Sequence, residues 1–423
     1  MSNTSPSVVV IGLGYVGLPL AVGIARHFPT IGFDISTERV AELKTGHDRT
    51  GEVDPPDLKA TTMTLTADAA DIAGHDVYIV TVPTPVDLEN KPDLGPVMKA
   101  CATVGQAMKK GSVVVFESTV YPGVTEDLCG PELEKHSGLV CGADFFLGYS
   151  PERINPGDRE HTVDRITKVI AGQTPEVTEL LAQVYGAVTT GGVFRAASIQ
   201  AAEAAKVIEN AQRDINIAFV NEITMIFQKL GLSIYDVLDA SATKWNFLNF
   251  KPGLVGGHCI GVDPFYLATC SLQNGHNPEV ILAGRRINDG MGPWIGARIS
   301  ERIPAKSKIL VLGLTFKENV PDLRNSKVVD VIAALRLRGH DVVVHDHHAD
   351  PVEAKHEYGE TLLTDLDGLS GFDCLVGAVP HTDYVALDNT QIERLVKAGG
   401  LIADVKGMWR GRDLPKDRTL WRL

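Results

Sequence analysis

The stretch VVVIGLGYVGLPLAVGIA, residues 8–25, decides the fold of the N-terminal part of this chain. Its β-branched start at 8–11 predicts a strand, and the apolar run from Leu18 predicts a helix. Between them, Gly12-x-Gly14-x-x-Gly17 predicts a tight turn whose backbone can approach a pyrophosphate, with free N–H groups at the helix start supplying partial positive charge. The stretch therefore predicts a strand, a turn and a helix that bind a dinucleotide.

A second strand is expected at 31–33, and it ends at Asp34. A carboxylate at this position accepts hydrogen bonds from a ribose 2′-hydroxyl and repels a 2′-phosphate, which favours NAD over NADP. The alternative is a glycine-rich packing turn with a capping Asp.

Length and charge limit the class of protein. At 423 residues the chain suggests two or three domains. The formal charge of -13, from 40 Lys and Arg against 53 Asp and Glu, disfavours a nucleic-acid surface. An anionic small molecule can still bind through local backbone donors.

The cysteines and the apolar runs indicate the compartment. Six cysteines without paired metal spacing argue against a disulfide framework and against a zinc site, so no metal is expected. The N-terminal residues carry no basic region before an apolar run, and no later stretch reaches about 18 uncharged apolar residues. We therefore expect a cytoplasmic protein without membrane insertion.

Polar residues follow three further expected strands, at 77–82, 113–116 and 145–149. Ligands bind beyond the carboxyl ends of parallel strands, which places Thr84, Ser118 and Thr119 at the cofactor cleft. Each is as readily a helix cap. The third strand leads to Glu152 and Arg153 in a proline-bounded loop with Asn155, Pro156 and Gly157, which we interpret as functional rather than as a surface turn.

A long helix is expected over 198–230, because this segment has few breakers and a helical apolar rhythm. Lys206 and Asn210 are four residues apart, so they lie on one face about one turn from each other. Such side chains are usually only solvated, but the alanines around them leave room for a ligand. A helix of this length also suits a subunit interface.

A cysteine loop follows at 253–264, with the sequence GLVGGHCIGVDP. Glycines on both sides expose Cys259, and Asp263 lies four residues further on. We interpret this segment as a nucleophile loop.

The strand-then-glycine pattern restarts at 308–317, and further strands are expected at 341–346, 372–378 and 400–404, with a helix at 328–335. The predicted fold class is α/β, with two Rossmann-like parallel-sheet domains joined by a long central helix. The expected domains are 1–197, 198–303 and 304–423. Lys317 and Arg324 are candidates for phosphate contact, or ordinary surface charges.

Six motifs in this order resemble the UDP-glucose/GDP-mannose dehydrogenase family. They are GLGYVGLP at 12–19, ESTV at 117–120, SPE at 150–152, AxKxxxN at 204–210, GGHC at 256–259 and GxxFK at 313–317. The resemblance implies an NAD-binding Rossmann domain, a central helix used for dimerisation and a C-terminal domain that binds the UDP-sugar. It also implies a four-electron oxidation of C6 from alcohol to carboxylate, with two NAD consumed.

The resemblance assigns roles to individual residues. Cys259 would carry a thiohemiacetal and then a thioester, which divides a hard oxidation into two steps. Its pKa should lie below the free value of about 8.5 for the thiolate to attack. Lys206 and Asn210 would stabilise oxyanions at C6. Asp263, Glu152 and Thr119 would position water and relay protons.

The same resemblance gives the ligand contacts. Cofactor contacts are expected from Gly12, Gly14, Tyr15, Val16, Gly17, Asp34, Arg39, Thr84, Ser118, Thr119 and Arg324. Substrate contacts are expected from Arg153, Lys206, Asn210, Lys251, Gly253, Gly256, His258, Phe316 and Lys317.

Residues beside Cys259 point to a branch of the family. His258 and Ile260 flank the cysteine and Val262 precedes Asp263, a pattern similar to enzymes of the Vi-antigen type that act on UDP-N-acetylhexosamines. UDP-N-acetylglucosamine is favoured, with UDP-N-acetylgalactosamine, UDP-N-acetylmannosamine and UDP-glucose as alternatives. Some relatives place an arginine from the neighbouring subunit in the sugar site, whereas this chain offers only Lys244 there. A two-electron hydroxy-acid dehydrogenase and a non-catalytic nucleotide-sugar sensor remain as competing hypotheses.

Overall fold

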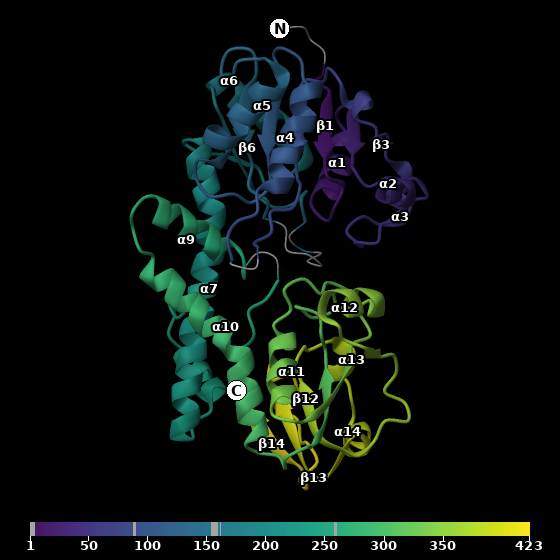
Figure 1. The fold of residues 1–423 in the computed structure, drawn as a ribbon, viewed down its shortest axis with the longest axis vertical. Helices are drawn as coiled ribbons and strands as arrows, with labels where there is room; N and C mark the ends of the chain where they lie inside the picture. Colours follow the sequence, from purple (N-terminus) through teal and green to yellow (C-terminus); the bar gives the residue numbers. More distant parts are fainter. Residues whose placement is uncertain (1–4, 88–89, 154–159, 161, 258–259) are drawn as a thin grey trace. The chain divides into compact units, whose positions relative to one another are not determined.

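The computed structural model describes residues 5–87, 90–153, 160, 162–257 and 260–423. These residues form two compact units, Met1–Glu209 with Phe265–His276, and Asn210–Pro264 with Asn277–Leu423. Each unit contains a largely parallel sheet covered by helices (Figure 1). The predicted α/β class with two such sheets and a long central helix is confirmed, whereas the expected three-part division of the chain stays a prediction.

The sheet of the first unit has the strand order β3-β2-β1-β4-β5-β6-β7-β8. Its strands are β1 Val8–Ile11, β2 Thr30–Phe33, β3 Thr64–Thr66, β4 Val77–Val80, β5 Val113–Phe116, β6 Phe146–Tyr149, β7 Lys168–Gly172 and β8 Val193–Arg195. All pairs are parallel except β6 with β7, which is antiparallel. The order reverses between β1 and β4, and such a switch point is where open α/β sheets bind ligands.

Helices cover both faces of this sheet because its strands are apolar on both sides. Along β1, Val8 and Val10 pack with α1 Gly17–Ala25 and α6 Pro175–Val188. Val9 and Ile11 pack on the other face with α4 Gly95–Ala107 and α5 Gly130–Ser137. The elements between the strands are α1 Gly17–Ala25, α2 Thr37–Lys44, α3 Pro55–Ala60, η1 Ala69–Ile72, α4 Gly95–Ala107, η2 Val124–Cys129, α5 Gly130–Ser137 and α6 Pro175–Val188.

The sheet of the second unit repeats the same order, β11-β10-β9-β12-β13-β14. Its strands are β9 Lys308–Leu312, β10 Asp341–His345, β11 Leu362–Leu363, β12 Phe372–Gly377, β13 Val396–Asp404 and β14 Thr419–Arg422. Its switch point lies between β9 and β12. One face packs on α10 Glu279–Ser300, α11 Val328–Leu337 and α12 Pro351–Tyr358, and the other on α13 Thr382–Val385 and α14 Asn389–Leu395.

The remaining helices include the predicted central helix, which is confirmed as α7 Ile199–Leu230. They are α8 Ile234–Ser241, α9 Asp263–Gln273, α10 Glu279–Ser300, α11 Val328–Leu337, α12 Pro351–Tyr358, α13 Thr382–Val385 and α14 Asn389–Leu395. Among the described residues, no helix has the length and apolar character needed to cross a membrane.

Candidate functional site

The glycine turn of the first unit follows β1 and has three glycines with different roles. Gly12 has φ +94°, a backbone conformation that other residues rarely adopt. A Cβ on Gly17 would lie 1.9 Å from the Gly12 carbonyl oxygen, so only glycine fits there. A Cβ on Gly14 would meet nothing within 4 Å. The turn is thus closed on its inner side and open at Gly14, where a pyrophosphate could approach the backbone.

Thr81, directly after β4, supports this turn and was not predicted from the sequence. Its hydroxyl lies 2.9 Å from the carbonyl oxygen of Ile11 and 2.7 Å from that of Gly12. Helix α1 then begins without a side-chain cap at Val16, and Tyr15 beside it is half-buried. The first N–H groups of α1 therefore remain suited to an anion.

Asp34 ends β2 as predicted, and its carboxylate is half-buried beside the turn. It accepts hydrogen bonds from the N–H of Leu13 at 2.8 Å and from the N–H of Ser36 at 2.9 Å. Arg39, expected to contact the cofactor, is buried, and its Nε donates to the Leu13 carbonyl at 2.9 Å. Its Nη2 donates to Asp48 at 2.7 Å, so Arg39 is held by Asp48 and supports the backbone of the glycine turn at Leu13.

The carboxyl ends of β4 and β5 carry the predicted polar residues. The Ser118 hydroxyl donates to the Val82 carbonyl at 2.6 Å, which joins the segments after the two strands. The Thr84 carbonyl accepts from the Tyr266 hydroxyl at 3.0 Å, and Thr119 is half-buried. These residues line the edge of the sheet next to the switch point.

A buried charged cluster lies behind this edge, and sequence reasoning missed most of it. Lys168, at the start of β7, places its ammonium 3.1 Å from the Glu117 carboxylate and 5.1 Å from the centre of the Tyr185 ring. Burial raises the pKa of Glu117 to about 6; Lys168 opposes this rise, and the charge of Glu152 adds to it. The predicted catalytic Glu152 is itself buried, close enough for its charge to act on Glu117.

Arg153 was expected to contact the substrate, and in this structure it pairs with Glu209 on α7. The closest nitrogen and oxygen atoms are 2.7 Å apart. Asn155, Pro156 and Gly157, which complete the predicted loop, lie outside the described residues.

The central helix presents Lys206 and Asn210 one turn apart, and both side chains are buried rather than solvated. The Asn210 amide nitrogen donates to the Asp263 carboxylate at 2.5 Å. Two of the predicted catalytic residues are thereby brought together although they are far apart in the sequence. His258 and Cys259 lie outside the described residues.

The start of the cysteine loop packs against the segment after β9 in the second unit. A Cβ on Gly256 would lie 2.4 Å from the Asn325 carbonyl oxygen, and a Cβ on Gly257 would lie 2.9 Å from the Phe316 ring. Glycine is therefore required at 256 and 257, and the loop is next to the predicted uridine contact Phe316.

Lys406 was missed by sequence reasoning and lies beside the same loop. A Cβ on Gly253 would lie 2.8 Å from the Lys406 ammonium nitrogen. No local motif marks Lys406, because it follows β13 about 150 residues after the loop that it approaches. An ammonium at this position could meet an anionic group held by the loop.

Three other predicted cations differ in their surroundings. Lys317 is half-buried after β9. Arg324 forms a two-point ion pair with Asp322, with Nε 2.9 Å from one carboxylate oxygen. The exposed Lys251 donates to the Asn249 side chain at 2.9 Å.

A buried histidine fixes the loop that carries Phe316 and Lys317. Nδ1 of His381 accepts from the N–H of Asn319 at 2.9 Å, so the hydrogen-bond partners assign the ring proton to Nε2. Nε2 lies 3.1 Å from Asp346 and 3.1 Å from the Thr315 hydroxyl. Burial opposes ionisation of Asp346, but the hydrogen bonds it accepts outweigh burial and hold its pKa well below the ordinary value.

The described part of the chain does not bring together three or more His, Cys, Asp or Glu side chains in a way that could hold a metal ion.

Comparison with known proteins identifies each part of the chain. Residues 6–189 match the NAD-binding domain of the UDP-glucose/GDP-mannose dehydrogenase family, residues 200–290 its central domain and residues 310–411 its UDP-binding domain. The chain is 53% identical to protein CapL of Staphylococcus aureus, covering 99% of both chains. It is 49% identical to UDP-N-acetyl-D-glucosamine 6-dehydrogenase of Pseudomonas aeruginosa, covering 98% of this chain and 99% of that one.

A solved structure is similar over almost the full length. UDP-D-ManNAc dehydrogenase from Pyrococcus horikoshii superimposes with a TM-score of 0.87 at 27% identity, covering 98% of each chain.

Proposed function

The chain belongs to the UDP-glucose/GDP-mannose dehydrogenase family of NAD-dependent enzymes, and from this premise we propose that it oxidises C6 of a UDP-N-acetylhexosamine, with UDP-N-acetylglucosamine preferred, to the uronic acid. The observation that carries this proposal is the 49% identity to a UDP-N-acetyl-D-glucosamine 6-dehydrogenase over nearly the whole chain. The 27% identity to the UDP-D-ManNAc enzyme makes that sugar the weaker candidate.

The first unit fits the cofactor. Its open Gly14, the half-buried Asp34 and the uncapped start of α1 suit a pyrophosphate and a ribose without a 2′-phosphate. When bound, NAD supplies the acceptor for the hydride that leaves C6. Thr84, Ser118 and Thr119 remain proposed contacts at the same edge of the sheet.

Residues on α7 and in the cysteine loop would carry out the chemistry. The Cys259 thiolate adds to the C6 aldehyde to give a thiohemiacetal, which loses a second hydride to become a thioester; water then releases the carboxylate and the free thiol. Lys206 and Asn210 stabilise negative charge on the C6 oxygen. Asp263 holds the Asn210 amide nitrogen at 2.5 Å, which limits the directions in which this amide can point.

In the second unit, Phe316 and Lys317 would bind the uridine and its phosphates, with Lys406 as a further cation beside Gly253. Glu152 and Thr119 would position water for thioester hydrolysis. Arg153, Lys251, Gly253, Gly256 and His258 remain proposed substrate contacts, and Arg39 and Arg324 proposed cofactor contacts.

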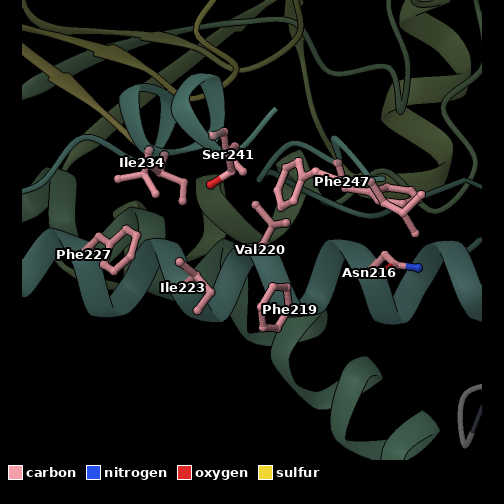
Figure 2. Close-up of a pocket in the computed structure, with 12 residues that line it drawn as sticks. Asn216, Phe219, Val220, Ile223, Phe227, Ile234, Ser241 and Phe247 are labelled. Atoms are coloured by element: carbon pink, nitrogen blue, oxygen red, sulfur yellow. The ribbon is translucent and has the colours of Figure 1, made fainter. Parts of the chain in front are cut away.

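We further propose that the binding partner is a second copy of the chain, bound through α7. A cavity of about 280 Å³ between α7, α8 and residues 241–250 is lined almost entirely by apolar side chains, including Phe219, Phe227 and Phe247 (Figure 2). Phe219 is 59% exposed and Trp245 is 92% exposed. An apolar face of this kind is typical of an obligate interface.

The test measures the NADH formed when the purified protein is given NAD and one UDP-sugar at a time. We expect two NADH per UDP-N-acetylglucosamine, and loss of acid formation in Cys259→Ser but not in the control Cys270→Ser, since Cys270 lies on α9. One NADH per sugar with Cys259 dispensable would indicate a two-electron dehydrogenase. Tight binding of a UDP-sugar without any NADH would indicate a sensor.

A further inference from the structure

A chain of buried polar side chains crosses from α10 to α7 in the second unit. Nη1 of Arg285 donates to Asp214 at 2.7 Å, and Nδ2 of Asn288 donates to the same carboxylate oxygen at 2.8 Å. Nδ2 of Asn221 then donates to Oδ1 of Asn288 at 2.8 Å. Each of these four residues is at most 2% exposed. The chain therefore runs through the interior of the unit, away from solvent.

The chain ends on the backbone of Gly253, the first residue of the cysteine loop. Oδ1 of Asn221 accepts from the Gly253 N–H at 2.8 Å, and its Nδ2 donates to the Gly253 carbonyl at 3.0 Å. One amide side chain thus pairs with both backbone groups of one residue, as a neighbouring strand would. With the bond to Asn288, both amide protons and the carbonyl oxygen of Asn221 are used.

The direction of every bond in the chain follows from Asp214. An ionised carboxylate can only accept, so Asn288 must present its nitrogen to Asp214 and its oxygen to Asn221. Asn221 must then present nitrogen to Asn288, which leaves its oxygen for the Gly253 N–H. Burial raises the pKa of Asp214, and the charge of Arg285 opposes that rise. Arg285 thus supports the acceptor on which the orientation of both amides depends.

Stability alone is a weak reason for such a chain. Buried charged pairs are often no more stabilising than apolar side chains of the same size, whereas they can specify one arrangement. Here the polar chain specifies the position of the cysteine loop rather than the packing of α7 against α10. Gly253 is six residues before Cys259 in the sequence, and Gly256 and Gly257 further along the loop pack on Asn325 and Phe316.

We propose that Asn221 is a positioning residue that fixes Gly253, and through it the loop bearing Cys259, and that Asn288, Asp214 and Arg285 hold the Asn221 amide in the orientation this requires. The inference rests on the proposed function only for its effect on turnover. Its effect on the loop itself is independent of any substrate.

The test compares Asn221→Ala and Asn221→Asp with the control Thr224→Val. Aspartate keeps the acceptor for the Gly253 N–H but cannot donate to Gly253 or Asn288. Thr224 lies on the same helix and is equally buried, but its hydroxyl donates to the Val220 carbonyl of that helix at 2.7 Å. It therefore matches Asn221 in burial without contributing to the loop.

Two measurements are made on each variant. In hydrogen exchange, peptides covering 250–257 should exchange about tenfold faster or more in both Asn221 variants and at the wild-type rate in Thr224→Val. Asn221→Ala removes both partners of the Gly253 backbone, and Asn221→Asp removes the donor to its carbonyl and places a carboxylate beside it. In turnover with UDP-N-acetylglucosamine, kcat should fall by about tenfold to a hundredfold while the KM for NAD stays within about twofold, as expected for a misplaced reacting group.

Each result has a definite meaning. Unchanged exchange at 250–257 in Asn221→Asp, or an equal effect of Thr224→Val, overturns the inference. If Asn221→Ala does not fold, Asn221→Asp carries the comparison because it preserves the shape of the side chain. A wild-type protein that oxidises no UDP-sugar overturns the proposed function, and the exchange result then still decides whether Asn221 holds the loop.

Discussion

Replacing Lys168 with Met should destabilise the first unit through the charge that it leaves behind. The ammonium of Lys168 and the carboxylate of Glu117 are 3.1 Å apart, and both side chains are at most 1% exposed. Removing one partner of a buried pair costs about 3–5 kcal/mol, because the other charge stays buried without compensation. Glu117 would then face the charge of Glu152 without an ammonium to offset it.

The loss of stability in Lys168→Met should depend on pH, because the charge of Glu117 does. The pKa of Glu117 is already raised from its ordinary value of 4.5 to about 6, with burial as the largest cause. A raised folded-state pKa contributes stability below about pH 4.5, and that contribution is lost as the pH rises through 6. Without Lys168 the pKa rises further, at about 1.4 kcal/mol per pH unit. The deficit of Lys168→Met should therefore be small at pH 5 and clearly larger at pH 8.

The assay must report on the first unit alone. Trp245, Trp294, Trp409 and Trp421, the only tryptophans of the chain, all belong to the second unit, so their fluorescence serves as an internal control. Hydrogen exchange of peptides covering β5 and β7, followed at pH 5 and pH 8 after correction for intrinsic rates, measures the local free energy of opening. The double variant Lys168→Met with Glu117→Gln removes both charges and should recover most of the loss.

Two outcomes would refute this reasoning. An equal deficit at both pH values would mean that Lys168 acts by packing on Tyr185, whose ring centre is 5.1 Å from its ammonium, and not by charge. A double variant as unstable as the single one would lead to the same conclusion.

Five further substitutions, two of them controls, test the ligand sites and the apolar face. Gly14→Ala should fold normally and raise the KM for NAD by about tenfold or more, because an added Cβ meets no protein atom but narrows the approach of a pyrophosphate. Gly17→Ala should instead unfold the turn, and circular dichroism distinguishes this loss of structure from the loss of NAD binding in Gly14→Ala. Phe219→Glu should convert a dimer to monomers in analytical ultracentrifugation, whereas Leu337→Glu, at a position 87% exposed on α11, should leave the mass unchanged. His381→Leu loses the acceptor for the loop backbone and should raise the KM for the UDP-sugar about tenfold with the KM for NAD unchanged. Equal changes in both KM values would contradict a role confined to that loop.

Local patterns were sufficient to predict much of the fold. The runs at 8–11, 113–116 and 309–312 are apolar and end at glycine or polar residues, and each is buried in a strand. The helix predicted at 198–230 begins within one residue of α7. These features depend on neighbouring residues alone. Strand β7 was missed because its apolar run is only the three residues 169–171, and the buried Lys168 at its start has its partner 51 residues away.

Partners that are distant in the sequence also limited the prediction of the candidate functional site. Arginines can be recognised as candidates for anionic ligands, but their protein partners cannot be read from the local sequence. Arg39 pairs with Asp48, Arg153 with Glu209, and only Arg324 has its partner within two residues. Their assigned ligand contacts stay predictions. By contrast, Asn210 and Asp263 lie together, and the family resemblance assigned catalytic roles to both, although no local pattern predicts their contact.

At the switch point of each sheet, an acid at the end of the second strand accepts a hydrogen bond from the turn after the first strand. Small differences in that turn decide what each sheet can bind. In the first unit Gly12, Leu13 and Gly14 follow β1, and Asp34 accepts from the Leu13 N–H. In the second unit Asp346 accepts from the Leu314 N–H at 2.6 Å in the same way, but the position of the open Gly14 is taken by the buried Thr315.

The side chain at that position closes the second site to a dinucleotide. The Thr315 hydroxyl donates to the Lys317 carbonyl at 3.0 Å, so the backbone of this turn is not open to a pyrophosphate. Asp346 is buried against His381, so its carboxylate is not open to a ribose. In the first unit Asp34 is half-buried and Gly14 is exposed. The same topology thus forms a candidate dinucleotide site in the first unit, whereas in the second unit the equivalent acid, Asp346, helps to hold the loop of Phe316 and Lys317.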